Sequence, residues 1–420
     1  MWKRKVWTLL LALLVLSAAW YPANSISRAL GEAGDLVSAR TSQAESITGA
    51  EFAQSVEQAK QTGQELPPLL LWERRDNELI SGYLDRQTTV QAVEYVGDPN
   101  LLYGMRFLVG GWPQNDNGCV IDEIAANSIW GSAQVVGQTL TWGTRELEIT
   151  GVLDSQGGTA YFPAGNLTDH LFSRLLLDLS QQGTGVFGAS QVMQQIGFPQ
   201  SQCYDYGLWA WLAKAAVRLP ALLLWLSFAV AALRRHRGLS LRPLTLISGG
   251  GCLLAALLLG GIAQFVGLPG RLIPTRWSDF DFWRQQVQSL GESLQAFLSQ
   301  GGSWWEIRFW SALAACAGLS LLALAGVLAV LGHRGGAGGR LTAVSCTLWW
   351  LLLLAQMSFG PKLLYILPSL RLWFAIPLWL LLRWGLDRYG HWLRMETGKE
   401  EGCNEETAAP GAERKNTDEP

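Results

Sequence analysis

The chain has 420 residues, of which 49% are hydrophobic and only 16% charged, and it contains 21 tryptophans. So apolar a balance is unusual for a soluble globular protein and indicates a membrane protein. The formal net charge of −2 leaves no basic surface of the kind that nucleic-acid binding needs, so no nucleic-acid partner is expected.

The first predicted element is the apolar run Val6–Tyr21, which follows the cationic stretch 3–5. This arrangement is typical of a first membrane span, and also of a cleavable signal peptide with its small-residue site at Ala23-Asn24-Ser25. We take residues 1–21 as the first span and keep the signal peptide as the alternative.

Residues 22–206 contain no long apolar run and predict one extracytoplasmic domain. Thr48 and Glu51 form a capping box that predicts the start of a helix of about four turns, with Phe52, Val56 and Ala59 on one face. The segment Leu179–Ile196 also favours a helix. Period-two alternation and short apolar runs predict strands, so the domain is of the α+β class. The predicted strands are Leu69–Glu73, Thr88–Val96, Cys119–Asp122 and Glu146–Leu153.

Within this domain, the stretch Leu101–Asp154 carries a recognisable pattern. A turn with glycine and arginine leads through an acidic residue and a strand into a short helix, and a second glycine turn leads into another strand. We expect Gly131 to end the helix in the left-handed conformation and Gly137 to turn the chain back. The positions that carry the pattern are Gly104, Arg106, Asp116, Trp130, Gly131, Gly137 and Gly151.

On these residues the stretch resembles the extracytoplasmic core of MacB/FtsX-type ABC-transporter permeases. The resemblance implies a membrane subunit that works with a separate ATP-binding protein, and a homodimer is a candidate assembly. Typical members have one span before the outer domain and three after it, with a long cytoplasmic loop that couples to the ATPase. The present chain departs from that plan, because five apolar stretches follow the domain and the first basic connector is short.

Cys119 and Cys203 are the only cysteines of the predicted outer domain. An extracytoplasmic compartment permits a disulfide, and these two residues are then its only intramolecular choice. Two free thiols remain the alternative.

Further apolar stretches are long enough to cross the ~30 Å of a bilayer core. With the first run they predict six spans, because every basic connector then lies on one side, as the positive-inside rule requires. The protein is thus expected to be a multi-pass α-helical plasma-membrane protein with an extracytoplasmic α+β domain between its first and second spans and both termini cytoplasmic. The later stretches are Leu208–Leu233, Leu244–Val266, Trp305–Leu331, Leu341–Phe359 and Leu363–Leu386, so residues 207–386 form a five-span membrane domain.

The connector after the second span carries Arg234, Arg235, Arg237 and Arg242. The resemblance implies that this is where an ATPase would dock. The simpler interpretation is that these arginines only orient the protein in membrane lipid.

An outside segment, residues 267–303, contains an amphipathic helix predicted to lie on the membrane surface or on the outer domain, with a gating role as the alternative. The tail, residues 387–420, is cytoplasmic and its last part lacks the apolar content for a core, which predicts disorder.

The sequence holds no C-x-x-C, H-E-x-x-H, G-x-S-x-G or G-x-x-x-x-G-K-[ST] pattern. We therefore expect no enzymatic activity, no catalytic or metal-binding residues and no cofactor. The predicted function is that of a permease-like subunit of an ABC-type transport or extraction system for a hydrophobic or lipid-linked substrate. The alternative is a non-transporting membrane sensor or scaffold that uses its outer domain as a binding module.

Overall fold

The computed structural model describes residues 2–32, 34–42, 45–63, 65–154, 157–165, 170–180, 185–199, 201–236, 304–332, 339–359 and 376–385, with single positions between 280 and 295 and at 374, 387 and 388. The chain divides into two compact units, described here separately. The sheet unit holds Ala23–Val217 and Gln264–Gly318, and the helical unit holds Met1–Pro22, Arg218–Ala263 and Leu319–Pro420.

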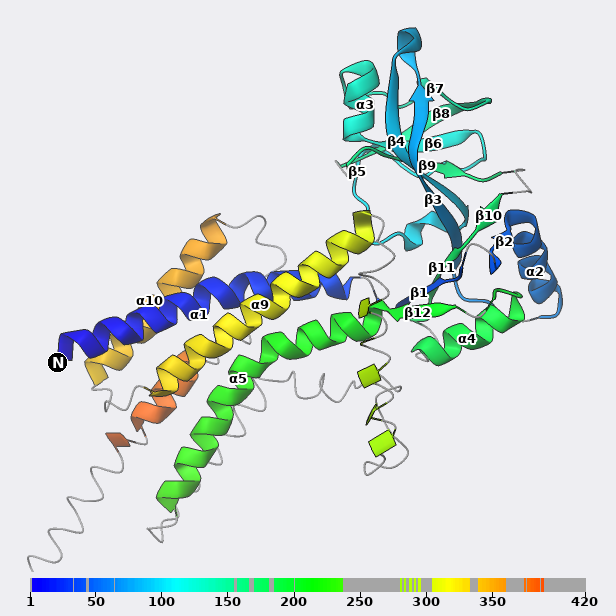
Figure 1. Cartoon of the computed structure of the whole chain (residues 1–420). Coiled ribbons are helices and arrows are strands. Elements are labelled where there is room, and N and C mark those ends of the chain that lie inside the picture. The colour runs from blue at the N-terminus through cyan, green and yellow to red at the C-terminus, as the bar shows by residue number, and fades with distance from the viewer. Residues whose placement is uncertain are drawn as a thin grey trace, which may run out of the picture. The chain divides into compact units, whose positions relative to one another are not determined.

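The sheet unit is built on a ten-stranded mixed sheet with three short helices, α2 (Gly49–Gln61), α3 (Glu123–Trp130) and α4 (Gly185–Gln195) (Figure 1). Its strand order is β12-β1-β11-β3-β4-β9-β6-β8-β5, and β7 pairs with both β3 and β8. The strands are β1 (Leu36–Arg40), β3 (Leu69–Ser81), β4 (Gln87–Gly97), β5 (Phe107–Gly110), β6 (Gly118–Asp122), β7 (Thr139–Trp142), β8 (Arg145–Leu153), β9 (Thr159–Pro163), β11 (Arg174–Asp178) and β12 (Gln202–Asp205). A separate small pair joins β2 (Ile47–Thr48) to β10 (Leu171–Phe172).

The double pairing of β7 closes part of the sheet into a ring. Pairings run from β3 through β4, β9, β6, β8 and β7 and return to β3. Closing a sheet on itself satisfies strand edges that would otherwise expose unpaired backbone groups. The strands β12, β1 and β11 extend the sheet beyond this ring on the side of β3.

Two hydrophobic cores result, and the long hairpin β3–β4 contributes to both. The first core packs β1, β11 and the start of β3 against α2 and α4, with Val37, Phe52, Leu71 and Phe172 among its buried residues. The second core fills the ring and the adjoining face of α3, and Trp142 stacks on Phe162 there with ring centroids 4.2 Å apart.

Several local predictions for this domain are confirmed. Thr48 caps α2, and its reciprocal contact with Glu51 is present as a full capping box. Phe52 and Ala59 are buried, and Val56 packs against the first core, so the predicted apolar face exists. The predicted strands fall within β3, β4, β6 and β8, although β3 runs eight residues beyond the predicted Glu73, to Ser81.

Long apolar helices make up most of the rest of the described chain: α1 (Trp2–Gly31), α5 (Tyr206–His236), α9 (Trp304–Gly332) and α10 (Gly339–Phe359). Among the described residues, three segments are long and apolar enough to cross a membrane: Trp7–Gly31, Tyr206–Phe228 and Trp305–Gly332. Helix α1 continues ten residues past the predicted end at Tyr21, with Pro22 inside it. The predicted spans Leu244–Val266 and most of Leu363–Leu386 lie outside the described residues.

Within the helical unit, the helices pack through specific contacts. Gly326 of α9 lies so close to Leu16 of α1 that an added Cβ would be 3.1 Å from the Leu16 Cβ. Trp20 of α1 contacts Trp349 of α10, and Trp379 Nε1 donates to Ser227 Oγ of α5 over 3.3 Å. Close approach at a small residue is the usual basis of helix association in lipid.

Different structural constraints favour glycine at the different motif positions of the sheet unit. Gly131 is the left-handed C-cap of α3 with φ 72°, and Gly104 and Gly137 also have positive φ, of 74° and 86°. Gly151 of β8 instead faces the backbone of Gly111, whose oxygen would lie 2.7 Å from an added Cβ. The prediction that Gly131 ends the helix and that Gly137 turns the chain is confirmed.

We expect Gly151→Ala to destabilise the protein by about 2 kcal/mol, because the new methyl group overlaps backbone atoms that cannot rotate away. Gly131→Ala serves as the matched control, since its Cβ meets open space and only the left-handed backbone is strained, at about 1 kcal/mol. Denaturation midpoints of the detergent-solubilised full-length variants measure both effects. Equal shifts in the two variants would contradict the role assigned to Gly151.

Candidate functional site

The predicted disulfide between Cys119 and Cys203 is wrong, and both cysteines are free thiols. Cys119 lies on β6 inside the second core, whereas Cys203 lies on β12 and packs against the first core. Five strands separate β6 from β12 in the sheet order, whereas a disulfide needs Cα atoms about 4–7 Å apart. Burial raises the pKa of Cys119 to about 12 and that of Cys203 to about 11, so both stay protonated near neutral pH.

The other predicted site residues do not converge on one place. Arg106 and Asp116 are exposed, and Trp130 packs against the second core beside Gly82 of the β3–β4 turn. Arg234 and Arg235 lie in the last turn of α5, while Arg237 and Arg242 lie outside the described residues. Among the residues that the structure describes, no group of three His, Cys, Asp or Glu side chains is placed to hold a metal ion.

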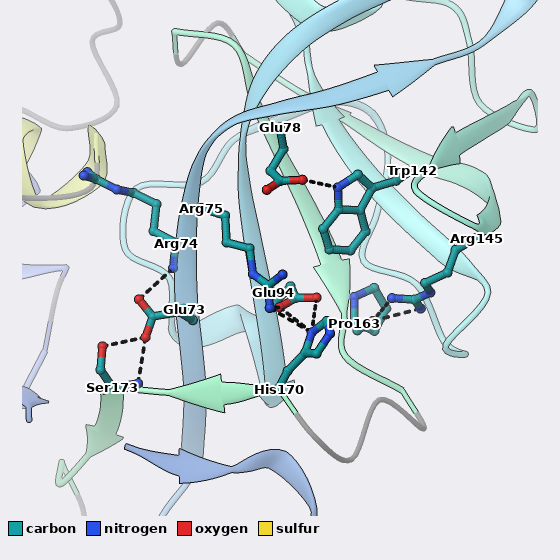
Figure 2. A network of polar contacts seen from close by, with 10 residues as sticks. All are labelled: Glu73, Arg74, Arg75, Glu78, Glu94, Trp142, Arg145, Pro163, His170 and Ser173. Carbon is teal, nitrogen blue, oxygen red and sulfur yellow. Dashed lines mark hydrogen bonds and ion pairs between the residues drawn. The ribbon is translucent and has the colours of Figure 1, made fainter. Parts of the chain in front are cut away.

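The polar side chains of the sheet unit gather in two charge clusters. The first, which we call the waist cluster, joins Glu73 and Arg75 of β3 and Glu94 of β4 to His170 and Ser173, which flank β10 (Figure 2). The second, the joint cluster, consists of Arg40, Arg174, Tyr206 and Glu306.

The waist cluster compensates the repulsion between two like charges within the sheet. Glu73 and Glu94 are directly opposite each other on β3 and β4, and like charges at such positions repel. Each carboxylate therefore has its own partners. Glu94, fully buried, pairs with Arg75 Nη2 at 2.9 Å and with His170 Nδ1 at 2.8 Å (Figure 2).

Glu73 is stabilised by hydrogen bonds instead. Its Oε2 accepts from the Ser173 backbone N–H over 2.7 Å and from the Ser173 hydroxyl over 2.5 Å. His170 and Ser173 belong to one short segment that includes β10 and leads into β11. That segment therefore compensates both carboxylates and fixes the hairpin where it passes from one core to the other.

The joint cluster also compensates two like charges that face each other in the sheet, but here both charges are positive. Arg40 ends β1 and is directly opposite Arg174 on β11. Glu306, in the first turn of α9, forms an ion pair with Arg40, and the Tyr206 hydroxyl donates to the same carboxylate over 3.3 Å. The Arg40 and Glu306 side chains are 5% and 0% exposed, so the pair is shielded from water.

The two arginines of the joint cluster differ in their electrostatics. Burial works against the charge of Arg40, but the attraction of Glu306 and its hydrogen bond outweigh this effect, and the pKa of Arg40 is raised. For Arg174, burial and then repulsion from Arg40 lower the pKa, and the guanidinium stacks over Trp72 at 4.7 Å. The cluster is thus a strongly interacting group whose negative member comes from α9.

Aromatic rings surround this ion pair on the α9 side. Trp305 contacts both Trp72 of β3 and Tyr206, with centroids 5.7 and 5.8 Å apart, and Phe309 contacts Tyr206 and Tyr103 at 4.8 and 5.7 Å. Sequence analysis did not predict this packing. The only local signal was one acidic residue, Glu306, at the start of an apolar run.

Comparison with known proteins finds similarity within the first 191 residues, which include most of the sheet unit. Residues 10–191 match the family model described as the MacB-like periplasmic core domain. The matched residues are thus similar to a MacB-like core domain, which supports a likeness to MacB/FtsX-type permeases. This confirms the resemblance inferred from the motif between Leu101 and Asp154.

Solved structures similar to the MacB-like domain are the periplasmic region of MacB from Actinobacillus actinomycetemcomitans and the extracellular domain of YknZ, a noncanonic ABC-type transporter from Gram-positive bacteria. The first is 13% identical with a TM-score of 0.33, covering 41% of this chain and 89% of that one. The second is 11% identical with a TM-score of 0.29, covering 41% and 98%. None of the curated proteins compared matches the chain.

Replacing Glu94 with Gln is expected to destabilise the protein by roughly 2 kcal/mol, because Arg75 and His170 lose the buried carboxylate that both contact. Asp76→Asn is the matched control, since Asp76 pairs with Arg74 but its side chain is 50% exposed, where an ion pair contributes little. Urea denaturation of the full-length protein compares the two. A midpoint for Glu94→Gln no lower than that for Asp76→Asn would contradict the waist cluster's role.

Proposed function

We propose that the protein is the permease-like membrane subunit of an ABC-type transport or extraction system. The observation that carries this proposal is the match of residues 10–191 to the MacB-like domain in a chain that also has helices able to span a membrane. In this proposal the substrate is hydrophobic or linked to a lipid, because apolar helices directly precede and follow the domain in the sequence.

The proposed arrangement places residues 22–206 outside the plasma membrane, between the first and second of six spans, with both termini in the cytoplasm. Its support is the distribution of arginines and lysines among the connectors. The first span then includes residues 1–21, the five-span membrane domain residues 207–386, and the cytoplasmic tail residues 387–420.

Energy for transport would come from a separate ABC ATP-binding subunit, since the sequence contains no nucleotide-binding loop of its own. The proposed docking site is the connector with Arg234, Arg235, Arg237 and Arg242. A homodimer of the permease-like chain, surrounded by membrane lipid, is the assembly that this proposal favours.

A sensor or scaffold is the second candidate function, and one feature of the sequence favours it. The resembled permeases couple to their ATPase through a long cytoplasmic loop, whereas the basic connector from Arg234 to Arg242 is short. In this alternative the MacB-like domain binds a ligand or partner without any transport.

The six-span topology predicts that Ser278→Cys reacts with an impermeant maleimide in intact cells, because residue 278 then lies outside. Ser240→Cys, in the arginine connector, should react only after the membrane is opened. Labelling of position 240 in intact cells would contradict the topology.

The docking proposal predicts that changing Arg235, Arg237 and Arg242 together to Gln abolishes co-purification of an ATP-binding protein, because the docking surface loses its charge. Changing Arg388, Arg394 and Lys399 to Gln is the control, since it removes as much charge from the same proposed side of the membrane. Quantitative mass spectrometry of the purified complexes measures the loss. If the wild-type protein brings down no ATP-binding subunit from its native membrane, the sensor or scaffold function is favoured instead.

A further inference from the structure

The start of α9 is tied to the sheet unit although it is far from that domain in sequence. About a hundred residues separate β12, which ends at Asp205, from Trp304. Nevertheless the segment up to Gly318 belongs to the same compact unit as the ten-stranded sheet. Helices α1 and α5 join the sheet unit through the continuous chain, whereas α9 is held to β1, β3 and Tyr206 by side-chain contacts.

Among these contacts, the ion pair between Arg40 and Glu306 has a specific electrostatic reason. Arg40 and Arg174 face each other across β1 and β11, and their mutual repulsion is not relieved by any acidic residue of those two strands. Glu73, on neighbouring β3, acts on Arg174 more weakly than Glu306 does. Glu306 is therefore the main counter-charge, and a buried charge needs a partner.

We propose that Glu306 locks α9 onto the MacB-like domain, so that the outer part of α9 is an integral element of that domain and a third connection between it and the spans. One consequence is that an ATPase-driven movement could reach the sheet through α9. This consequence alone rests on the proposed function.

The native cysteines provide a direct readout. Cys316 of α9 is buried, and its Sγ lies 3.5 Å from the Ala23 carbonyl oxygen of α1. Cys119 is buried in the second core, on a different element. Loosening of α9 should therefore expose Cys316 to the membrane-permeant reagent N-ethylmaleimide while Cys119 stays protected, and peptide mass spectrometry distinguishes the two sites.

The experiment measures alkylation of full-length protein in native membranes for Arg40→Gln, Glu306→Gln and the double variant. Each single variant should raise the labelling rate of Cys316 roughly tenfold or more, because it removes the main counter-charge of a buried group. The double variant should be labelled more slowly than either single variant, because the buried guanidinium and carboxylate that form the ion pair are then both absent. Asp281→Asn is the control, since Asp281 and Arg284 form an exposed pair on another segment.

Wild-type labelling of Cys316 in both single variants would overturn the proposal. If a single variant also exposes Cys119, the domain has unfolded, and the double variant then decides: restored protection of both cysteines supports the lock, and continued exposure contradicts it. Addition of ATP to membranes that contain the partner tests the consequence separately. A labelling change caused by the substitutions but not by ATP would leave the lock in place and count against the proposed transport function.

Discussion

The sheet of the MacB-like domain places like charges opposite each other at two positions, and the surrounding structure depends on how they are neutralised. Glu73 faces Glu94 across β3 and β4, and Arg40 faces Arg174 across β1 and β11. Repulsion at such positions would oppose strand pairing if it were not compensated. In both cases part of the compensation comes from outside the two strands, although Arg75 of β3 also pairs with Glu94. The segment with His170 and Ser173 serves the glutamates, and Glu306 of α9 serves the arginines. Each cluster thereby fixes a distant segment against the sheet.

Features that depend on neighbours in sequence could be predicted from the sequence alone. The capping box of Thr48 and Glu51 involves residues three apart, and the left-handed conformation of Gly131 follows from the end of its own helix. The apolar runs of the long helices are equally local. The waist cluster was not predicted, because it joins Glu94 to His170, 76 positions away, and nothing in the spacing of these residues indicates that they meet.

The error over Cys119 and Cys203 has a related cause. Selecting the only two cysteines of a domain assumes that the chain can bring them together, and this depends on strand order. Here β6 is one of the strands that form the ring and pairs in parallel with β8, while β12 is an edge strand beside β1. Parallel pairs of this kind need crossover connections, which separate neighbours in sequence from neighbours in space. Composition and compartment alone could not have excluded the disulfide.

Glu306 shows why a charge at the end of an apolar helix is difficult to interpret from sequence. Such a residue is normally assigned to the lipid headgroup level, where it remains hydrated. In the structure its side chain is fully buried and contacts Arg40 and Tyr206, which makes it part of the domain's interior. The connections through α1 and α5 are covalent and cannot be released. The connection through α9 consists of side-chain contacts, the buried ion pair together with the aromatic rings of Trp305 and Phe309, so it is the one that a change of a single charge can weaken while the sheet remains folded.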